Sequence, residues 1–264
     1  MRLRRLGWAG LEVEQDGESL IVDHLIDPGV FARFYGVDRD ELIVPKPRRA
    51  RAALLTHLHL DHADVPAIER AVRSSGWVLK PERKAAETRL DEVATGAAEA
   101  ALAGSALEVR QCRAGDVFDL GAFRASALAA SDGFGSPQVS WLIEAGTRRI
   151  LHAGDTLWHG GWWDIAAAHG QIDIAFLPAN GVELNFPQWQ PAVSVPASMT
   201  PEQAVEAARA LLARQLVPIH YNRTFEHPDY YRPVPDARER IMVRAASSRT
   251  DVRFLEPGEW INVQ

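Results

Sequence analysis

The sequence predicts a layered α/β domain, and three observations carry that prediction. Short apolar or alternating runs flank Asp16-Gly17, a dipeptide typical of two-residue β-hairpin turns. An apolar run over residues 51–56 leads into a polar loop and then into a helix start signal, which gives the order strand, loop, helix. Helix start signals recur near the C-terminus, so helices and strands are mixed along the chain.

The first half of the chain is expected to open a β-sheet. Asp64 with Pro66 supplies an N-cap and a first-turn proline for a helix that runs through residue 73. Residues 91–107 are rich in alanine and leave the choice of element open. Strands are expected over residues 11–14, 19–23, 51–56 and 76–79, with several more between 106 and 130.

The second half repeats the mixture of strands and capped helices. Thr200, Pro201 and Gln203 form an N-cap, a first-turn proline and a capping-box partner for a helix to about residue 214. The same capping logic starts a last helix at Asp236. The proline-broken, uncharged run 184–201 is expected to be a surface loop. Strands are expected over residues 149–151, 172–177, 216–219, 253–255 and 260–263.

Composition narrows the class of protein. The 264 residues show no internal repeat and no flexible linker, which predicts one domain spanning 1–264. A net charge of −6, from 29 basic and 35 acidic residues, argues against a nucleic-acid or anionic-membrane binder and favours a small-molecule substrate. The single cysteine, Cys112, excludes a thiolate metal cluster. No signal peptide or membrane span is expected, so we expect a cytoplasmic protein, with homo-oligomerisation left open.

The segment THLHLDH, residues 56–62, carries the strongest chemical signal. His57 and His59 stand two apart at the end of a strand, where side chains repeat every two residues, so both can face one metal ion. Asp61 and His62 follow where the chain turns, and they can hold a second cation from another side.

Two later strand ends supply the remaining candidate ligands. Gly154 allows close backbone approach beside Asp155, which is the predicted bridge between the two metals. His220 ends a buried strand and can complete the second metal. Tyr221 and Asn222 follow it and are candidates for contact with an oxyanion or phosphate of the substrate.

The motifs THLHLDH, HAGDT (152–156) and PIHYN (218–222), in this order, resemble the metallo-β-lactamase superfamily. The closer resemblance is to its bacterial metal-dependent hydrolases related to L-ascorbate-6-phosphate lactonase. The resemblance implies a four-layer αββα sandwich with two metals at one edge of the β layers. It also implies the ligand set: His57 and His59 on the first metal, Asp61, His62 and His220 on the second, Asp155 between them, and Asp61 holding the attacking hydroxide.

The sequence departs from the family pattern at three places. Relatives carry a further histidine before the GDT strand, where this chain reads Ser131-Asp132-Gly133, and Asp132 is the predicted replacement ligand. Trp8-Ala9-Gly10 stands where relatives commonly have a histidine after the glycine. Asp23-His24 stands where relatives often have Asp-Pro, and Asp23 is still expected to orient a ligand imidazole as a hydrogen-bond acceptor.

These residues predict metal-dependent hydrolysis by a hydroxide that two divalent cations activate, with Asp61 and Asp155 as proton acceptors. Zinc is expected first, with manganese or iron as alternatives. A small ester or lactone is the expected substrate, and a phosphodiester is the alternative within hydrolases. Two other classes stay open: a metal-binding scaffold without turnover, suggested by the missing histidine, and an iron-dependent oxidoreductase.

Overall fold

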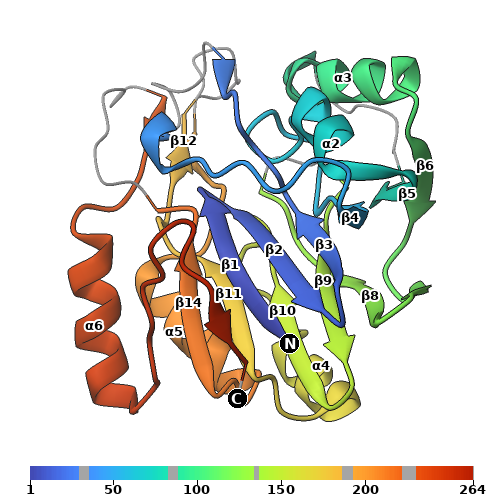
Figure 1. Cartoon of the computed structure of the whole chain (residues 1–264). Helices are drawn as coiled ribbons and strands as arrows, with labels where there is room; N and C mark the ends of the chain where they lie inside the picture. The colour runs from blue at the N-terminus through green and yellow to red at the C-terminus, as the bar shows by residue number, and fades with distance from the viewer. Residues whose placement is uncertain (30–35, 83–88, 134–136, 186–192, 222–229, 264) are drawn as a thin grey trace.

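The predicted hairpin at the N-terminus opens a seven-stranded sheet. Asp16 and Gly17 adopt φ of 51° and 79°, the left-handed pair that a tight two-residue turn needs, between β2 (Gly10–Gln15) and β3 (Glu18–Val22). The computed structural model describes all residues except 30–35, 83–88, 134–136, 186–192, 222–229 and 264 (Figure 1).

The strands of this first sheet run in the order β16-β1-β2-β3-β4-β5-β6. The bounds of its other members are β1 (Arg2–Gly7), β4 (Ala50–Leu54), β5 (Val72–Pro81), β6 (Glu108–Cys112) and β16 (Ile261–Asn262). Strands β3 to β6 are parallel, so their C-terminal ends meet at one edge of the sheet.

A second sheet of six strands has the order β14-β11-β10-β9-β8-β7. Its members are β7 (Val117–Leu120), β8 (Phe123–Ala129), β9 (Val139–Ala145), β10 (Arg148–His152), β11 (Ile174–Pro178) and β14 (Gln215–Ile219). β10, β11 and β14 are parallel. A small third sheet joins β12 (Glu183–Leu184), β13 (Val195–Pro196) and β15 (Tyr231–Arg232).

The two large sheets face each other, and helices cover both outer faces (Figure 1). In β11, Phe176 points into the core between the sheets, whereas its neighbours Ala175 and Leu177 pack toward the helices. The helices on the first sheet are α2 (Val65–Ala71) and α3 (Arg89–Gly104), and those on the second are α4 (Trp162–His169), α5 (Pro201–Ala210) and α6 (Ala237–Ser248). The four-layer αββα prediction is therefore confirmed.

Several predicted boundaries are wrong for identifiable reasons. The helix after Asp64 ends at Ala71, because Val72 already pairs with Ala50 in the sheet. The helix after Thr200 ends at Ala210, and the backbone N–H of Arg214 donates to Ile172 of the neighbouring loop. These tertiary hydrogen bonds replace helical ones near each helix end.

Two further expectations fail near the C-terminus. Asp236 has a left-handed backbone (φ 55°), so its side chain makes no cap hydrogen bond. Residues 253–255 form no strand; only Val252 makes an isolated bridge, to Leu216.

None of the described helices combines the length and apolar character that crossing a membrane requires.

Candidate metal centre

The ends of four strands deliver the candidate ligands to one edge of the sandwich. β4 leads into the 56–62 motif, β10 into Asp155 and β14 into His220, while β3 leads into Asp23. Gly154 has φ of 63°, and a Cβ there would lie 2.6 Å from the Thr56 hydroxyl oxygen. Only glycine lets the turn before Asp155 approach the first motif this closely.

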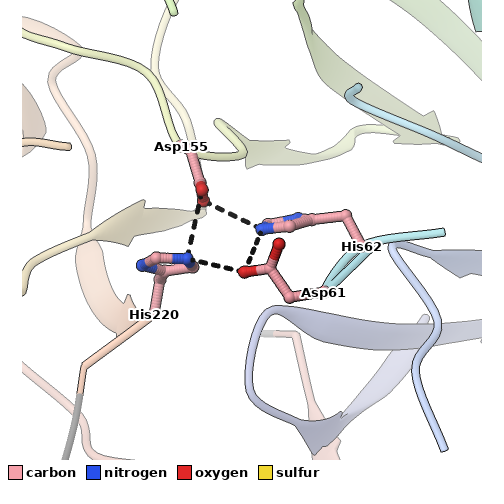
Figure 2. Close-up of side chains that lie close together, drawn as sticks. All are labelled: Asp61, His62, Asp155 and His220. Carbon is pink, nitrogen blue, oxygen red and sulfur yellow. Dashed lines mark hydrogen bonds and ion pairs between the residues drawn. The ribbon is translucent and has the colours of Figure 1, made fainter. Parts of the chain in front are cut away.

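Four of the candidates form the second half-site, defined as Asp61, His62, Asp155 and His220 (Figure 2). The Nε2 atom of His62 lies 3.1 Å from Asp155 Oδ1 and 3.4 Å from Asp61 Oδ2. The Nε2 atom of His220 lies 3.1 Å from Asp155 Oδ2 and 3.2 Å from Asp61 Oδ2. All four side chains are buried.

These spacings fit a divalent cation. Ligand atoms about 2.1 Å from a tetrahedral ion lie roughly 3.4 Å from one another, close to the four contacts of the second half-site. His62 Nε2 and Asp155 Oδ1 face each other, yet both are buried and make no hydrogen bond among the described residues. Imidazole nitrogens with carboxylate oxygens are a donor set that suits zinc, manganese or iron.

The first half-site is defined as His57, His59 and Asp155, whose ligand atoms also lie within 4.8 Å of one another. His57 Nε2 is buried, makes no hydrogen bond within the described part of the chain, and lies 3.8 Å from Asp155 Oδ2. The ring of His59 lies 4.5 Å from that of His57 and is half-buried. Asp155 is the carboxylate that the two half-sites share, which is where a bridging ligand would stand.

Asp23 and Thr56 fix the orientation of two of these imidazoles. Asp23 accepts hydrogen bonds from the Thr56 backbone (2.8 Å), from the Thr56 hydroxyl (2.7 Å) and from His62 Nδ1 (2.9 Å). Because the Thr56 hydroxyl donates its only proton to Asp23, its oxygen accepts a hydrogen bond from His57 Nδ1 at 2.9 Å. In its neutral form each of these two histidines therefore carries its proton on Nδ1 and its lone pair on Nε2. Asp23 also groups with His57 and His62, but its oxygens are occupied by these bonds.

The facing carboxylates and imidazoles of the centre shift one another's pKa values. Burial opposes the charged form of His62 and His220, but the facing carboxylates raise the pKa of His62 well above its usual range and that of His220 to about 9. Burial alone would raise the pKa of Asp61 and Asp155, yet the same imidazoles hold both well below normal. Burial and the charge of His62 lower the pKa of His57 well below its usual range. A cation would therefore displace protons from His62 and His220.

Of the other predicted residues, neither Asp132 nor Tyr221 belongs to a ligand group among the described residues. The backbone of Ser131, the neighbour of Asp132, is bonded to Thr156 (3.0 Å) and Leu157 (2.8 Å), just after Asp155. Tyr221 packs its ring against Phe254 and under the Arg5 guanidinium. Asn222 lies outside the described residues. The roles of Asp132, Tyr221 and Asn222 stay predictions.

Sequence reasoning missed the contribution of two residues. Thr56 is part of the quoted motif, yet only the fold reveals its bonds to Asp23 and His57. Trp8 donates from Nε1 to Asp61 Oδ2 at 2.9 Å, a contact across 53 positions that no local pattern signals. His152, the first residue of the HAGDT motif, donates from Nε2 to the Ala9 carbonyl at 2.7 Å.

Comparison with known proteins places these residues in a family. Residues 24–221 match the family described as beta-lactamase superfamily domain. The chain is 27% identical over 265 residues to a UPF0173 metal-dependent hydrolase of Thermococcus kodakarensis, covering 98% of both chains. It is 31% identical over 192 residues to one of Bacillus licheniformis, covering 67% of this chain and 70% of the relative.

A solved structure shares the fold. The diiron β-hydroxylase CmlA of Streptomyces venezuelae superposes with a TM-score of 0.73 at 17% identity, covering 99% of this chain and 54% of that one. The closer resemblance to L-ascorbate-6-phosphate lactonase stays a prediction. The family match and the two relatives together show that the chain belongs to the beta-lactamase superfamily, and within it to the UPF0173 metal-dependent hydrolases.

Proposed function

We propose that the chain hydrolyses a small ester or lactone with two divalent cations, zinc first and manganese or iron as alternatives. The observation that carries this proposal is the pair of ligand groups that share Asp155. The proposed ligands are His57, His59, Asp61, His62, Asp155 and His220. Asp132 is proposed as a further ligand on the first half-site, where the group holds only three ligands.

The chain's own side chains would divide the work at the centre. When bound, the two cations would lower the pKa of a water toward neutrality and polarise the scissile carbonyl. Asp61 and Asp155 would hold and orient the water and accept its proton. Asp23 and Thr56 keep His62 and His57 in the tautomers that leave Nε2 free.

Two features support a small, uncharged ester or lactone as the substrate, in preference to a nucleic-acid phosphodiester. The net charge of −6 gives no general attraction for a polyanion. The first half-site has fewer protein ligands than the second and a half-buried histidine, which leaves coordination space for a substrate oxygen. The resemblance of the motifs to L-ascorbate-6-phosphate lactonase favours a lactone within this class.

The test is metal content by plasma mass spectrometry on protein purified without a metal-affinity tag, run beside a panel of lactones and phosphodiesters. Two equivalents with chelator-sensitive turnover of a lactone would support the proposal. One equivalent or none, without turnover after reconstitution, would favour a metal-binding scaffold. Asp119→Asn, an exposed carboxylate on β7, is the matched control and should keep full metal and turnover.

A further inference from the structure

The hairpin turn between β1 and β2 places an aromatic residue against the metal centre. Gly7 pairs with Gly10, so Trp8 and Ala9 form the two-residue turn, and Trp8 adopts φ of 41°. A hairpin turn accounts for the left-handed angle, but glycine or asparagine would meet it with less strain than tryptophan. The choice of a bulky residue therefore points to a role for its side chain.

The Trp8 side chain contacts two members of the second half-site. Its indole N–H donates to Asp61 Oδ2 at 2.9 Å, and its ring lies 4.3 Å from that of His220, centroid to centroid. Trp8 is only 5% exposed. The same Asp61 oxygen is the one that His62 and His220 approach, so the indole donor helps to decide which way this carboxylate faces.

The turn that carries Trp8 is itself fixed from both sheets. The Arg5 guanidinium donates to the Trp8 carbonyl at 3.1 Å, and His152 donates to the Ala9 carbonyl at 2.7 Å. The other ring nitrogen of His152 accepts from the Gly154 backbone at 3.3 Å, beside Asp155. The position of the indole is thus tied to the same turn that presents the shared carboxylate.

From these contacts we propose that Trp8 is a positioning residue for the second half-site, acting on Asp61 through its N–H and on His220 through its ring. This inference rests on the proposed function, because it assumes that the second half-site binds a cation. It assigns a role at the position where the family commonly carries histidine. A donor to a ligand carboxylate holds it in the binding orientation before the cation arrives.

The experiment titrates metal-free protein with cobalt(II) and follows both affinity and the visible absorption spectrum. Trp8→Phe keeps a ring over His220 and removes the N–H. We expect it to weaken one of two cobalt equivalents by about tenfold or more and to change the spectrum, as loss of an outer-shell partner does. Trp260→Phe is the matched control: Trp260 stacks under Arg2 and Arg4 at the opposite end of β1, and both readouts should stay unchanged.

A second measurement uses the wild type alone, so that it holds even where Trp8→Phe does not fold. Among the eight indole N–H signals of protein labelled with ¹⁵N-tryptophan, cobalt loading should displace one far more than that of Trp260. Wild-type affinity and spectrum in a folded Trp8→Phe, or equal displacement of all indole signals, would overturn the inference while leaving the proposed function intact. A wild type that binds no cobalt would refute the proposed function and this inference with it.

Discussion

The two half-sites share Asp155 but differ in how the fold supports them. In the second half-site the four contacts between a histidine nitrogen and an aspartate oxygen measure 3.1–3.4 Å, and all four side chains are buried. Trp8 donates a hydrogen bond to Asp61, and Asp23 accepts one from His62. In the first, His57 is fixed by Thr56, but His59 is half-buried and the third imidazole of the family pattern is absent. Under the proposed function, this difference predicts that the second half-site binds a cation more tightly than the first.

The largest effect is expected from removing the ligand that the half-sites share. Asp155→Ala should lose metal from both positions and lose turnover with it. The loss should exceed the roughly 10–100-fold that an outer-shell partner contributes. Plasma mass spectrometry and the lactone assay measure the two together, with Asp119→Asn as control. Full metal content in Asp155→Ala would contradict the shared role of this carboxylate.

Asp23→Asn should weaken metal binding at both half-sites, because Asp23 orients His62 directly and His57 through Thr56. The expected loss of metal affinity is about 10–100-fold. Competition with a calibrated chelator measures it. Loss confined to one equivalent would show that Thr56 orients His57 without Asp23.

Metal binding should depend on pH more steeply at the second half-site than at the first. His220 has a pKa of about 9 and that of His62 is raised, so a cation must displace their protons, whereas the pKa of His57 is lowered. The cobalt affinity of the second half-site should rise by about tenfold per pH unit for each proton displaced, between pH 7 and 9. An equal pH dependence of cobalt affinity at the two half-sites would refute the assignment of His62 and His220 to the second half-site.

The same groups should affect the stability of the metal-free protein with the opposite sign. The folded pKa of His220 lies above the unfolded value of about 6.5. Its stabilisation is therefore fully present below pH 6.5 and is lost as the pH rises through about 9. Urea unfolding midpoints of the metal-free protein should fall over that range, and a flat profile would argue against a charged His220.

The smallest effect is expected at the position where the family histidine is missing. Asp132→His should tighten only the weaker equivalent, by about tenfold, or roughly 1.4 kcal/mol of ligand binding. Asp119→His on β7 controls for unspecific binding by an added imidazole. An unchanged weaker equivalent would mean that the 131–133 segment does not reach the first half-site.

Local patterns predicted the mixture of strands and helices and the 56–62 motif, because hairpin turns, helix caps and this motif depend on neighbours in sequence. The four-layer arrangement and the full ligand set came from the resemblance to the metallo-β-lactamase superfamily. Asp16-Gly17 and the Thr200 capping box stand as expected. The contacts of Trp8 and His152 could not be predicted, since each joins residues that only the packing of the two sheets brings together. Asp236 shows the same limit, because its left-handed backbone overrides a favourable cap residue.

The most direct test of the central claim is anomalous X-ray scattering at the zinc absorption edge from crystals of the metal-loaded protein. The account predicts two zinc peaks at the edge of the sandwich, each about 2.0–2.3 Å from its ligand atoms and both in contact with Asp155. A single peak, or two peaks that share no ligand, would contradict it.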